Sequence, residues 1–237
     1  MKRHYFRVKE TIVTIIANEE FISLAEREIW QKRSDLEKFI SYNPLFRIAL
    51  DPYDVPISAP EIVKCMAEAG KKVGVGPMAS VAGAIAYYTV KVMVEAGANY
   101  AVVDNGGDIA MYIDRPLVAG IYTGNREVKG IGFKFLPRTE IFGLCTSSAT
   151  VGSSLSFGKV DAATVISKDV ILADATATAL GNSITQKNDL SIKKAMRKFM
   201  IEGIEGMIAI IDDKIGMCGE LPKIVNTRIN YALITKA

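Results

Sequence analysis

The chain has 237 residues, of which 49% are hydrophobic and 23% are charged, and its mean hydropathy is +0.20. This supply of apolar residues is enough for a substantial core and argues against a disordered chain. The net charge of +3 comes from scattered basic residues rather than from a basic stripe, so nucleic acid is not an expected partner.

The cysteine and histidine content narrows the chemistry further. Cys65, Cys145 and Cys218 lie far apart in the sequence, and His4 is the only histidine. A zinc site of the usual Cys/His kind is therefore excluded, and a nucleophile activated by histidine is disfavoured. The free thiols indicate a reducing compartment, and no apolar stretch of a signal peptide follows the first charged residues. We expect a cytoplasmic protein in which no uncharged run approaches membrane-spanning length.

Hydrophobic spacing and turn residues predict the elements in chain order. They are a strand at 11–17, helices at 19–42, 58–70 and 78–96, strands at 100–103, 109–113 and 117–122, a loop at 143–158, a strand at 163–166, helices at 171–180 and 190–202, and a hairpin at 207–218. Strands and helices mix without a steady βαβ alternation, and no linker divides the chain. The sequence therefore predicts an α+β fold with a mixed sheet and packed helices, as a single domain over residues 1–237.

A glycine-rich turn, Gly74-Val75-Gly76-Pro77, enters the third predicted helix. The turn is not a dinucleotide-binding fingerprint, because it lacks the third glycine of that motif and follows a helix rather than a strand. Free amides at the start of a helix still favour an anionic ligand. The alternative is a tight turn that only starts a helix.

Two further stretches carry polar groups beside glycine. Asp104-Asn105-Gly106-Gly107-Asp108 allows close approach of a ligand to the backbone, although Asn-Gly is equally typical of a plain hairpin turn. The predicted loop at 143–158 offers the hydroxyl groups of Thr146, Ser147 and Ser148 to a ligand.

The sharpest chemical signal is the pair Asp174 and Thr178. They are four residues apart, so a helix presents both on one face, among alanines that offer no partner to a charged carboxylate. A carboxylate and a hydroxyl are hard oxygen ligands that suit Mg²⁺ completed by water and phosphate. The alternative is that Asp174 caps its own helix while Thr178 bonds back to a carbonyl group.

These segments together resemble the ApbE superfamily of flavin transferases. The matching stretches, in order, are Gly76-Pro77-Met78-Ala79, Asn105-Gly106-Gly107-Asp108, and Thr164-Val165 followed by the helix that carries Asp174 and Thr178. The terminal hairpin, residues 206–217, also fits, so the resemblance covers most of the chain. The Val-Gly-Pro-Met-Ala, Asn-Gly-Gly-Asp and Cys-Thr-Ser-Ser stretches resemble most a family of ApbE-like proteins.

The resemblance implies an ApbE-like fold that binds flavin adenine dinucleotide (FAD) with Mg²⁺ between its phosphates and the protein. In the transferases, FMN moves from FAD to a threonine hydroxyl of a target protein. The implied metal ligands are Asp174, Thr178 and the carbonyl group of Ala79, with Asp174 also expected to be catalytic. The expected cofactor-binding residues are Gly76, Ala79, Asn105, Gly106, Gly107, Asp108, Thr146, Ser147 and Ser148.

Two departures from the family pattern keep other hypotheses open. Residues 152–158 contain neither the histidine nor the Asp-Pro of the transferases, and Ser80 stands where a lysine usually follows the metal-binding alanine.

The first hypothesis is a Mg²⁺-assisted enzyme that acts on a flavin or another nucleotide pyrophosphate. The second is a non-catalytic binder of a flavin or another small molecule, and the third is a structural or partner-binding protein. We expect a small-molecule nucleotide or flavin as partner and no membrane; association into a homo-oligomer is left open.

Overall fold

The computed structural model describes residues 1–124, 128, 130–148, 158–228 and 235. The larger of two sheets contains eight strands in the order β1-β2-β3-β4-β7-β8-β9-β10. Their bounds are Lys2–Val8, Thr11–Ala17, Ala101–Asn105, Asp108–Tyr112, Phe142–Ser147, Ala162–Ser167, Ile204–Ile211 and Lys214–Gly219. The smaller sheet has the order β11-β6-β5, from Lys223–Asn226, Ile131–Phe135 and Leu117–Gly120.

Six α-helices and two 3₁₀ helices complete the described fold. The α-helices are α1 (Ile22–Tyr42), α2 (Leu45–Ile48), α3 (Glu61–Val73), α4 (Val81–Glu95), α5 (Val170–Ser183) and α6 (Asp189–Phe199). The 3₁₀ helix η1 (Glu19–Phe21) leads into α1, and η2 (Pro77–Ser80) leads into α4.

The predicted α+β fold is confirmed. The expected mixed sheet is wrong in one respect, because every described strand pair is antiparallel.

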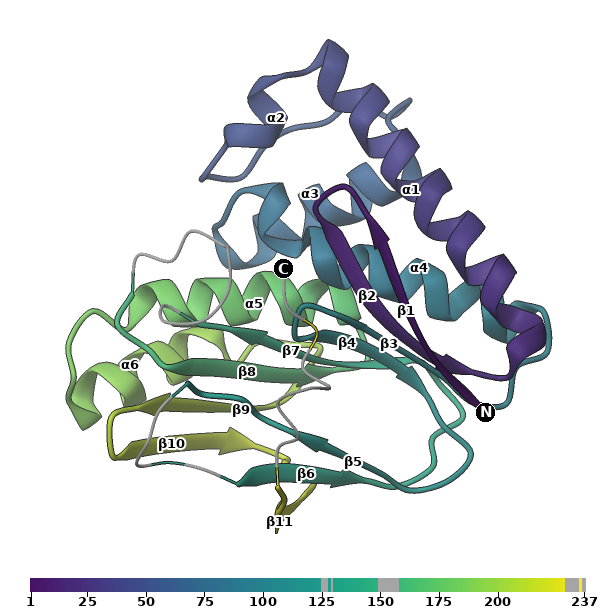
Figure 1. Ribbon diagram of the computed structural model, residues 1–237. Helices are drawn as coiled ribbons and strands as arrows, with labels where there is room; N and C mark the ends of the chain where they lie inside the picture. Colours follow the sequence, from purple (N-terminus) through teal and green to yellow (C-terminus); the bar gives the residue numbers. More distant parts are fainter. Residues whose placement is uncertain (125–127, 129, 149–157, 229–234, 236–237) are drawn as a thin grey trace.

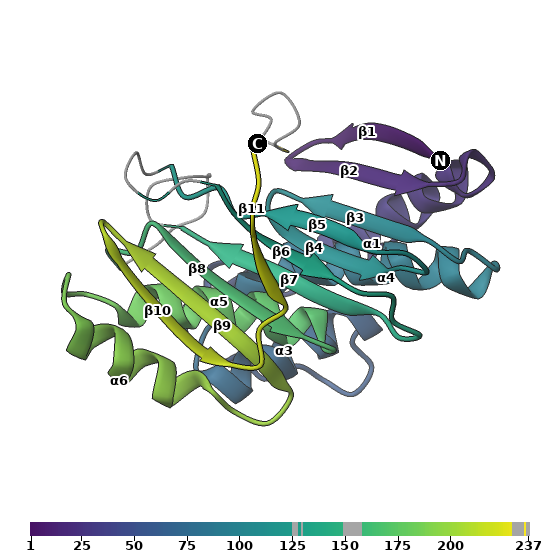
Figure 2. The ribbon, with the colours of Figure 1, turned by 90° about the horizontal axis from the view of Figure 1, so that it is seen from below.

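The large sheet separates two hydrophobic layers. Helices α3, α4, α5 and α6 lie on one face, and the small sheet lies on the other, as the two views together show (Figures 1 and 2). Residues alternate between the layers along each strand: in β3, Val103 joins the cluster on the helix side, whereas Val102 joins the cluster toward the small sheet. In β9, Met207 and Ile208 divide in the same way.

Helices α4 and α5 cross in the middle of the helix layer, and small side chains let them pack closely. A Cβ atom added at Gly83 of α4 would lie 2.8 Å from Cβ of Asp174 in α5 and 3.1 Å from the carbonyl oxygen of Val170. Distances below about 3 Å are closer than van der Waals contact, so only glycine fits at this crossing. The crossing therefore sets the position of Asp174.

One sequence-based expectation about membranes is corrected. The continuous helical stretch Pro77–Glu95 has 19 residues and is long and apolar enough, by length and composition alone, to cross a membrane. No charged residue lies between Lys72 and Lys91, so an uncharged run of near-spanning length does exist. In this structure, 56% of the apolar window is buried, and α4 packs on β3, β4, α1 and α5. A core helix of a globular fold passes the same test.

Most predicted elements match the structure, and four of the described strands were not predicted. The expected helix at 58–70 begins at Glu61 and continues past Gly70 to Val73, where Gly74 ends it with a left-handed φ of 78°. The expected loop at 143–158 is wrong in its first part, because residues up to Ser147 form β7. Residues 149–157 lie outside the described part of the chain. The unpredicted strands are β1, β6, β7 and β11.

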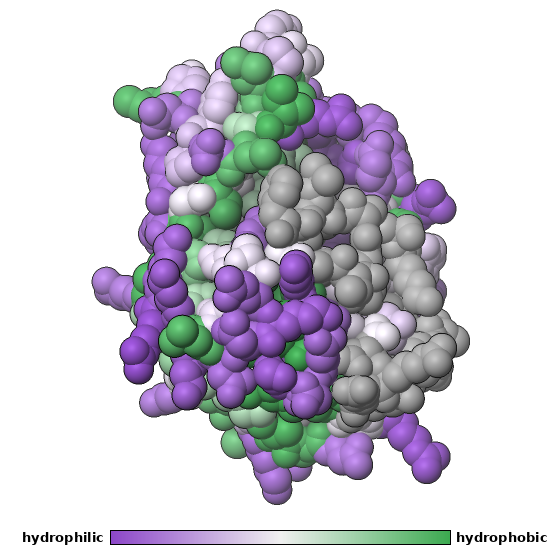
Figure 3. Space-filling model, turned by 90° about the vertical axis from the view of Figure 1, so that its left-hand side faces the viewer, coloured by the Kyte–Doolittle hydropathy of each residue, from purple (hydrophilic) through white to green (hydrophobic). Residues whose placement is uncertain are grey.

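Large apolar side chains are exposed where α2 and the following loop project from the helix layer. They are Tyr42, Leu45, Ile48, Leu50 and Ile57. Figure 3 shows hydrophobic residues gathered at the top of this face. Ile48 and Leu50 also line the cleft described next, so its rim is partly apolar.

Candidate functional site

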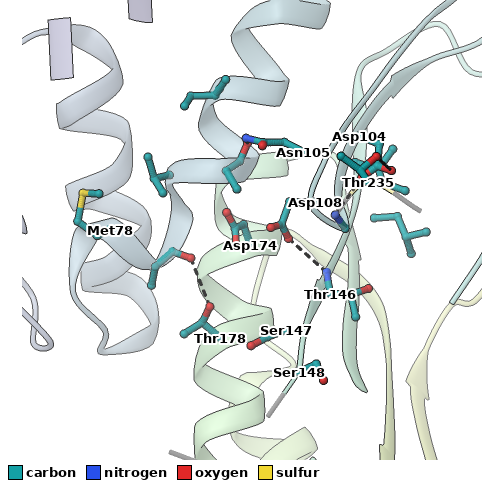
Figure 4. Close-up of a pocket in the computed structure, with 18 of the residues that line it drawn as sticks. Met78, Asp104, Asn105, Asp108, Thr146, Ser147, Ser148, Asp174, Thr178 and Thr235 are labelled. Atoms are coloured by element: carbon teal, nitrogen blue, oxygen red, sulfur yellow. Dashed lines mark hydrogen bonds between the residues drawn. The ribbon is translucent and has the colours of Figure 1, made fainter. Parts of the chain in front are cut away.

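A large cleft of about 1980 Å³ runs along the edge formed by β2, β3, β4 and β7, from the helix layer to β5 of the small sheet. The β3–β4 turn, the end of β7, the start of α4 and the second half of α5 all contribute to its lining. Segments from the first half of the chain therefore meet segments near residues 146 and 174 at one place. Figure 4 shows the side chains from these elements around a common space.

Asp174 is held in this wall by a contact between two helices. Its side chain is buried in the middle of α5, and its Oδ2 atom accepts a hydrogen bond of 2.7 Å from the backbone amide of Gly83. Gly83 is in the first turn of α4, where backbone amides lack partners within the helix and the helix dipole favours negative charge. Asp174 thus caps α4, and the alternative that it caps its own helix is wrong, since Asp169 does so through the amide of Leu172.

Burial changes the acidity of Asp174. Removal of the carboxyl group from water raises its pKa to about 7, and the hydrogen bond from Gly83 opposes this rise only in part. Near neutral pH the group therefore passes readily between its neutral and ionised forms. A cation that approached it would favour ionisation, because opposite charge lowers the pKa of a carboxyl group.

The two other implied metal ligands lie beside each other on the same wall. The Oγ1 atom of Thr178, one helical turn after Asp174, donates a hydrogen bond of 3.3 Å to the carbonyl oxygen of Ala79 in η2. These two residues are 99 positions apart in the sequence. Thr178 thus bonds to a carbonyl group of another element, whereas the alternative had it bonding back within its own helix.

The donor chemistry fits Mg²⁺. A carboxylate, a hydroxyl and a backbone carbonyl are hard oxygen donors, and Mg²⁺ is bound through one or two carboxylates together with water and substrate phosphates. Among the described residues, no group of three or more His, Cys, Asp or Glu side chains could form a cage for a metal ion. Asp174, Thr178 and Ala79 would therefore hold the ion only in part, and a bound phosphate would supply further oxygen ligands.

The Asn105-to-Asp108 segment is a two-residue hairpin turn. Asn105 pairs with Asp108, and Gly106 and Gly107 have φ angles of 70° and 105°. Only glycine adopts such angles readily, so the plain-turn interpretation is correct for the backbone. The turn also faces the cleft, because its residues line the cavity and a Cβ atom at Gly106 would meet open space. The side-chain amide of Asn105 anchors it by donating to the carbonyl oxygen of Ala82 at 3.1 Å.

Three carboxyl groups lie in this part of the cleft. Burial raises the pKa of Asp108 well above its usual value, and the nearby charges of Asp174 and Asp104 raise it further. Burial also raises the pKa of Asp104, while hydrogen bonds from Thr235 and from the amide of Gly107 lower it. The Oδ1 atom of Asp108 accepts a hydrogen bond of 3.3 Å from the amide of Thr146. The cluster favours a ligand that brings positive charge to it.

The three predicted hydroxyl residues reach the cleft from β7 and the residue after it. Thr146, Ser147 and Ser148 all line the cavity. The Oγ1 atom of Thr146 is 2.9 Å from that of Thr164 on β8, its cross-strand neighbour. Cys145 points to the opposite face of the sheet from Thr146, toward α5, where its buried thiol donates to the carbonyl oxygen of Val170 at 3.6 Å and lies beside the carboxyl group of Asp108. Burial raises the pKa of that thiol, so it stays protonated and inert.

Gly76 has a packing role beside the cleft. Its amide donates to the carbonyl oxygen of Leu50 at 2.7 Å, and an added Cβ atom would lie 1.8 Å from the carbonyl oxygen of Ala49. Gly76 thus holds η2 against the loop after α2.

All predicted site residues line the same cleft, and their roles in binding remain predictions. Gly83 belongs to a run of small residues in the sequence of α4 that indicates close packing, but the sequence does not indicate that it contacts Asp174. Asp104 was named only as part of the Asp104-to-Asp108 turn, and nothing in the sequence pattern marks Thr235.

Comparisons with known proteins identify the family of the chain. A family model described as "AbpE bacteria" matches residues 2–200. A UPF0280 protein of Methanothrix thermoacetophila is 49% identical over 238 residues, with 100% of both chains covered. A UPF0280 protein of Archaeoglobus fulgidus is 43% identical over 240 residues, also with 100% of both chains covered.

Solved structures share the fold at low sequence identity. The ApbE protein of Thermotoga maritima has a TM-score of 0.55 and 12% identity, and 100% of both chains is covered. The apo form of the flavinyl transferase ApbE of Pseudomonas stutzeri has a TM-score of 0.53 and 14% identity, with 94% of this chain and 95% of that chain covered. These similarities show an ApbE-like fold. The family model and the near relatives show that the chain belongs to the AbpE bacterial family and groups with the UPF0280 proteins.

Proposed function

We propose that this protein is a Mg²⁺-dependent transferase of the ApbE type that uses FAD, or a similar nucleotide pyrophosphate, as the donor of FMN to a hydroxyl group. One observation carries the proposal: the side chains of Asp174 and Thr178 and the carbonyl oxygen of Ala79, the implied ligand set, lie together on one wall of a large cleft. The similarity to structures titled as flavin transferases supports it only through the fold.

The charges around the cleft also favour a phosphate ligand. Arg3, Arg33, Arg47 and Arg228 line it, although Arg33 is already paired with Glu10 and Glu37. Basic side chains around a concave surface raise the local concentration of anions. When ionised, the carboxyl groups of Asp174 and Asp108 repel a bare pyrophosphate, so the proposal requires a cation between them and the ligand.

Each wall of the cleft has a defined part in the proposal. Gly83 fixes one oxygen of Asp174, which leaves the other, Oδ1, for the metal. The Gly106-Gly107 turn lets the ligand approach the backbone, and the hydroxyl groups of Thr146, Ser147 and Ser148 offer hydrogen bonds to it. When bound, Mg²⁺ neutralises phosphate charge and stabilises the leaving group.

A second function, non-catalytic binding of a flavin or similar ligand, is favoured by Ser80. This serine stands where the transferases usually carry a lysine, and here it is fully buried, with its hydroxyl donating to the carbonyl oxygen of Pro77 at 3.1 Å. It therefore contributes no positive charge to the cleft. The absence of histidine from residues 152–158 of the sequence points the same way.

Turnover of FAD distinguishes the two functions. We expect the wild type to release AMP from FAD in the presence of Mg²⁺ and a hydroxyl acceptor, as measured by chromatography. Asp174→Asn should lower the rate by at least about 100-fold, because even residues that only support a metal ligand typically cost 10- to 100-fold. Thr176→Val is the matched control, since Thr176 lies on the same helix with a buried hydroxyl that has no hydrogen-bond partner among the described residues.

Two further outcomes of this assay would contradict the transferase. FAD that binds with Mg²⁺ and stays intact would show a binding protein. FAD that neither binds nor reacts would contradict both functions.

A further inference from the structure

The segment around α2 exposes four large apolar side chains. Tyr42, Leu45, Ile48 and Leu50 are each at least 61% exposed, and together they are named the α2 patch. Figure 3 shows hydrophobic residues gathered where this segment projects from the helix layer. Single apolar side chains on a surface are ordinary, whereas a group of them on a projecting segment is typical of a surface that contacts another macromolecule.

The α2 patch is held in place from beneath. The side chain of Phe46 is fully buried, and its ring packs edge-to-face on the rings of Phe39 at 5.2 Å and Tyr53 at 5.6 Å. After α2, the carbonyl oxygen of Leu50 accepts a hydrogen bond of 2.7 Å from the amide of Gly76. The segment is therefore anchored, so a partner that covers the patch gains apolar burial without first having to order it.

The charges on the same segment favour a second copy of this chain as that partner. Arg47 and Asp51 are both exposed, and neither forms an ion pair with another described residue. In a dimer with twofold symmetry, the contact that one copy makes is repeated by the other. Arg47 of each copy can therefore pair with Asp51 of the other, which gives two identical ion pairs around one apolar centre.

The apolar area of the patch is close to what a symmetric dimer needs. Its four side chains expose on the order of 500 Å² per copy, or roughly 1,000 Å² for two copies, which is about the least that a specific interface buries. The polar side chains around the patch add to this area. An interface of this size is typical of weak complexes, so we expect association in the micromolar range.

We propose that the α2 patch is the contact surface of a homodimer with twofold symmetry, formed by packing of the two patches and by reciprocal ion pairs between Arg47 and Asp51. Arg47, Ile48 and Leu50 also line the cleft, so the second copy stands at its mouth. The interface is independent of the proposed function, because neither a flavin nor a metal takes part in it.

Sedimentation of the full-length protein measures the association directly. We expect the wild type to pass from a monomer of 25.8 kDa to a dimer as its concentration rises through about 1–100 μM. Leu45→Ser should raise the dissociation constant about tenfold or more, because it removes a large apolar side chain from the interface. Leu190→Ser is the matched control, since Leu190 is 76% exposed at the start of α6, away from α2 (Figure 1).

Three results of this experiment would overturn the proposal. They are a wild type that stays monomeric at the highest concentration, a Leu45→Ser protein that dimerises like the wild type, and a Leu190→Ser protein that is weakened as much as Leu45→Ser. A monomeric wild type would assign the patch to a different partner. Circular dichroism of each variant shows that a lost dimer is not a lost fold.

Exchange of the two charges tests the reciprocal pairing. Arg47→Asp and Asp51→Arg should each weaken the dimer several-fold, because each places like charges opposite one another twice. The double variant that carries both changes should regain most of the wild-type affinity, since the pairs form again with their signs exchanged. A double variant that binds no more tightly than either single variant would overturn this arrangement of the two copies.

Discussion

Asp174 combines a structural and a chemical role in one side chain. Its Oδ2 atom accepts a hydrogen bond from the amide of Gly83 at the start of α4, and its position beside Thr178 and Ala79 directs the rest of the carboxyl group toward the cleft. A buried carboxylate without a counter-ion is costly, and this cost is why its pKa is raised to about 7. The sequence indicated the unusual setting of Asp174 among alanines, but not the helix that it caps.

The raised pKa of Asp174 predicts how stability changes with pH. The folded state keeps the proton up to about pH 7, whereas the unfolded chain loses it near the ordinary value of 3.8. Without Mg²⁺, the free energy of unfolding should therefore fall as pH rises from about 4 to about 7, by on the order of a few kcal/mol at most. Asp104 and Asp108, whose pKa values are also raised, act in the same direction.

Urea unfolding at pH 5 and pH 8 measures this difference. Asp174→Asn should reduce the loss of stability between the two values, because the amide does not titrate, while Thr176→Val should keep the full loss. Mg²⁺ should stabilise the wild type more at pH 8, where Asp174 is ionised. Equal pH dependence in the wild type and Asp174→Asn would contradict the assignment.

At the scale of elements, the sequence predicted helices better than strands. Periodic apolar residues located α1, α5 and α6 to within a few positions, since a helix buries one face whatever its neighbours are. The residues of β7 are Phe-Gly-Leu-Cys-Thr-Ser, with the composition of a loop, and they were predicted as one. They form a strand because β4 and β8 pair with them on both sides, a long-range effect that local propensity does not contain.

The sequence predicted the local features of the site but not its long-range contacts. The motif glycines and the Asp-Thr pair could be read from the sequence, because each carries its chemistry within a few residues. The contact between Thr178 and Ala79, and that between Thr235 and Asp104, span 99 and 131 residues. Contacts of this kind follow from tertiary packing, such as that of α5 on η2, which no local pattern encodes.

Two glycines near the start of α4 are predicted to differ in how much stability the protein loses when each is replaced by alanine. A Cβ atom at Gly76 would overlap the carbonyl oxygen of Ala49 at 1.8 Å, whereas a Cβ atom at Gly74 would meet nothing within 4 Å. Gly74→Ala should cost about 1 kcal/mol, the penalty for a left-handed φ of 78°. Gly76→Ala should cost more, roughly 1–3 kcal/mol or above, and should also weaken ligand binding by displacing the rim formed by Ala49 and Leu50.

Urea unfolding of the two variants, with the wild type beside them, gives the free energies directly. A Gly76→Ala protein as stable as Gly74→Ala would show that the close approach of η2 to the loop after α2 is not required.

At the scale of the whole molecule, the antiparallel sheet and the crossed helices α4 and α5 bring distant segments to one cleft. One layer of the core fixes the helices on the sheet, and the other fixes the small sheet on the opposite face, so the cleft lies at the edge of a rigid unit. Its lining combines an incomplete set of hard oxygen donors, a close-approach turn, hydroxyl groups and arginines. This combination suits a ligand that supplies both phosphate oxygens and a large polar body.

Calorimetric titration of the wild type and Asp174→Ala with FAD, each with and without Mg²⁺, tests this account most directly. We expect micromolar binding by the wild type that requires Mg²⁺ and is lost in Asp174→Ala, with circular dichroism showing that the variant remains folded. Binding of equal strength without Mg²⁺, or binding that survives in the folded Asp174→Ala protein, would contradict the metal site. No binding under any condition would show that this member of the family has kept the fold without its flavin ligand.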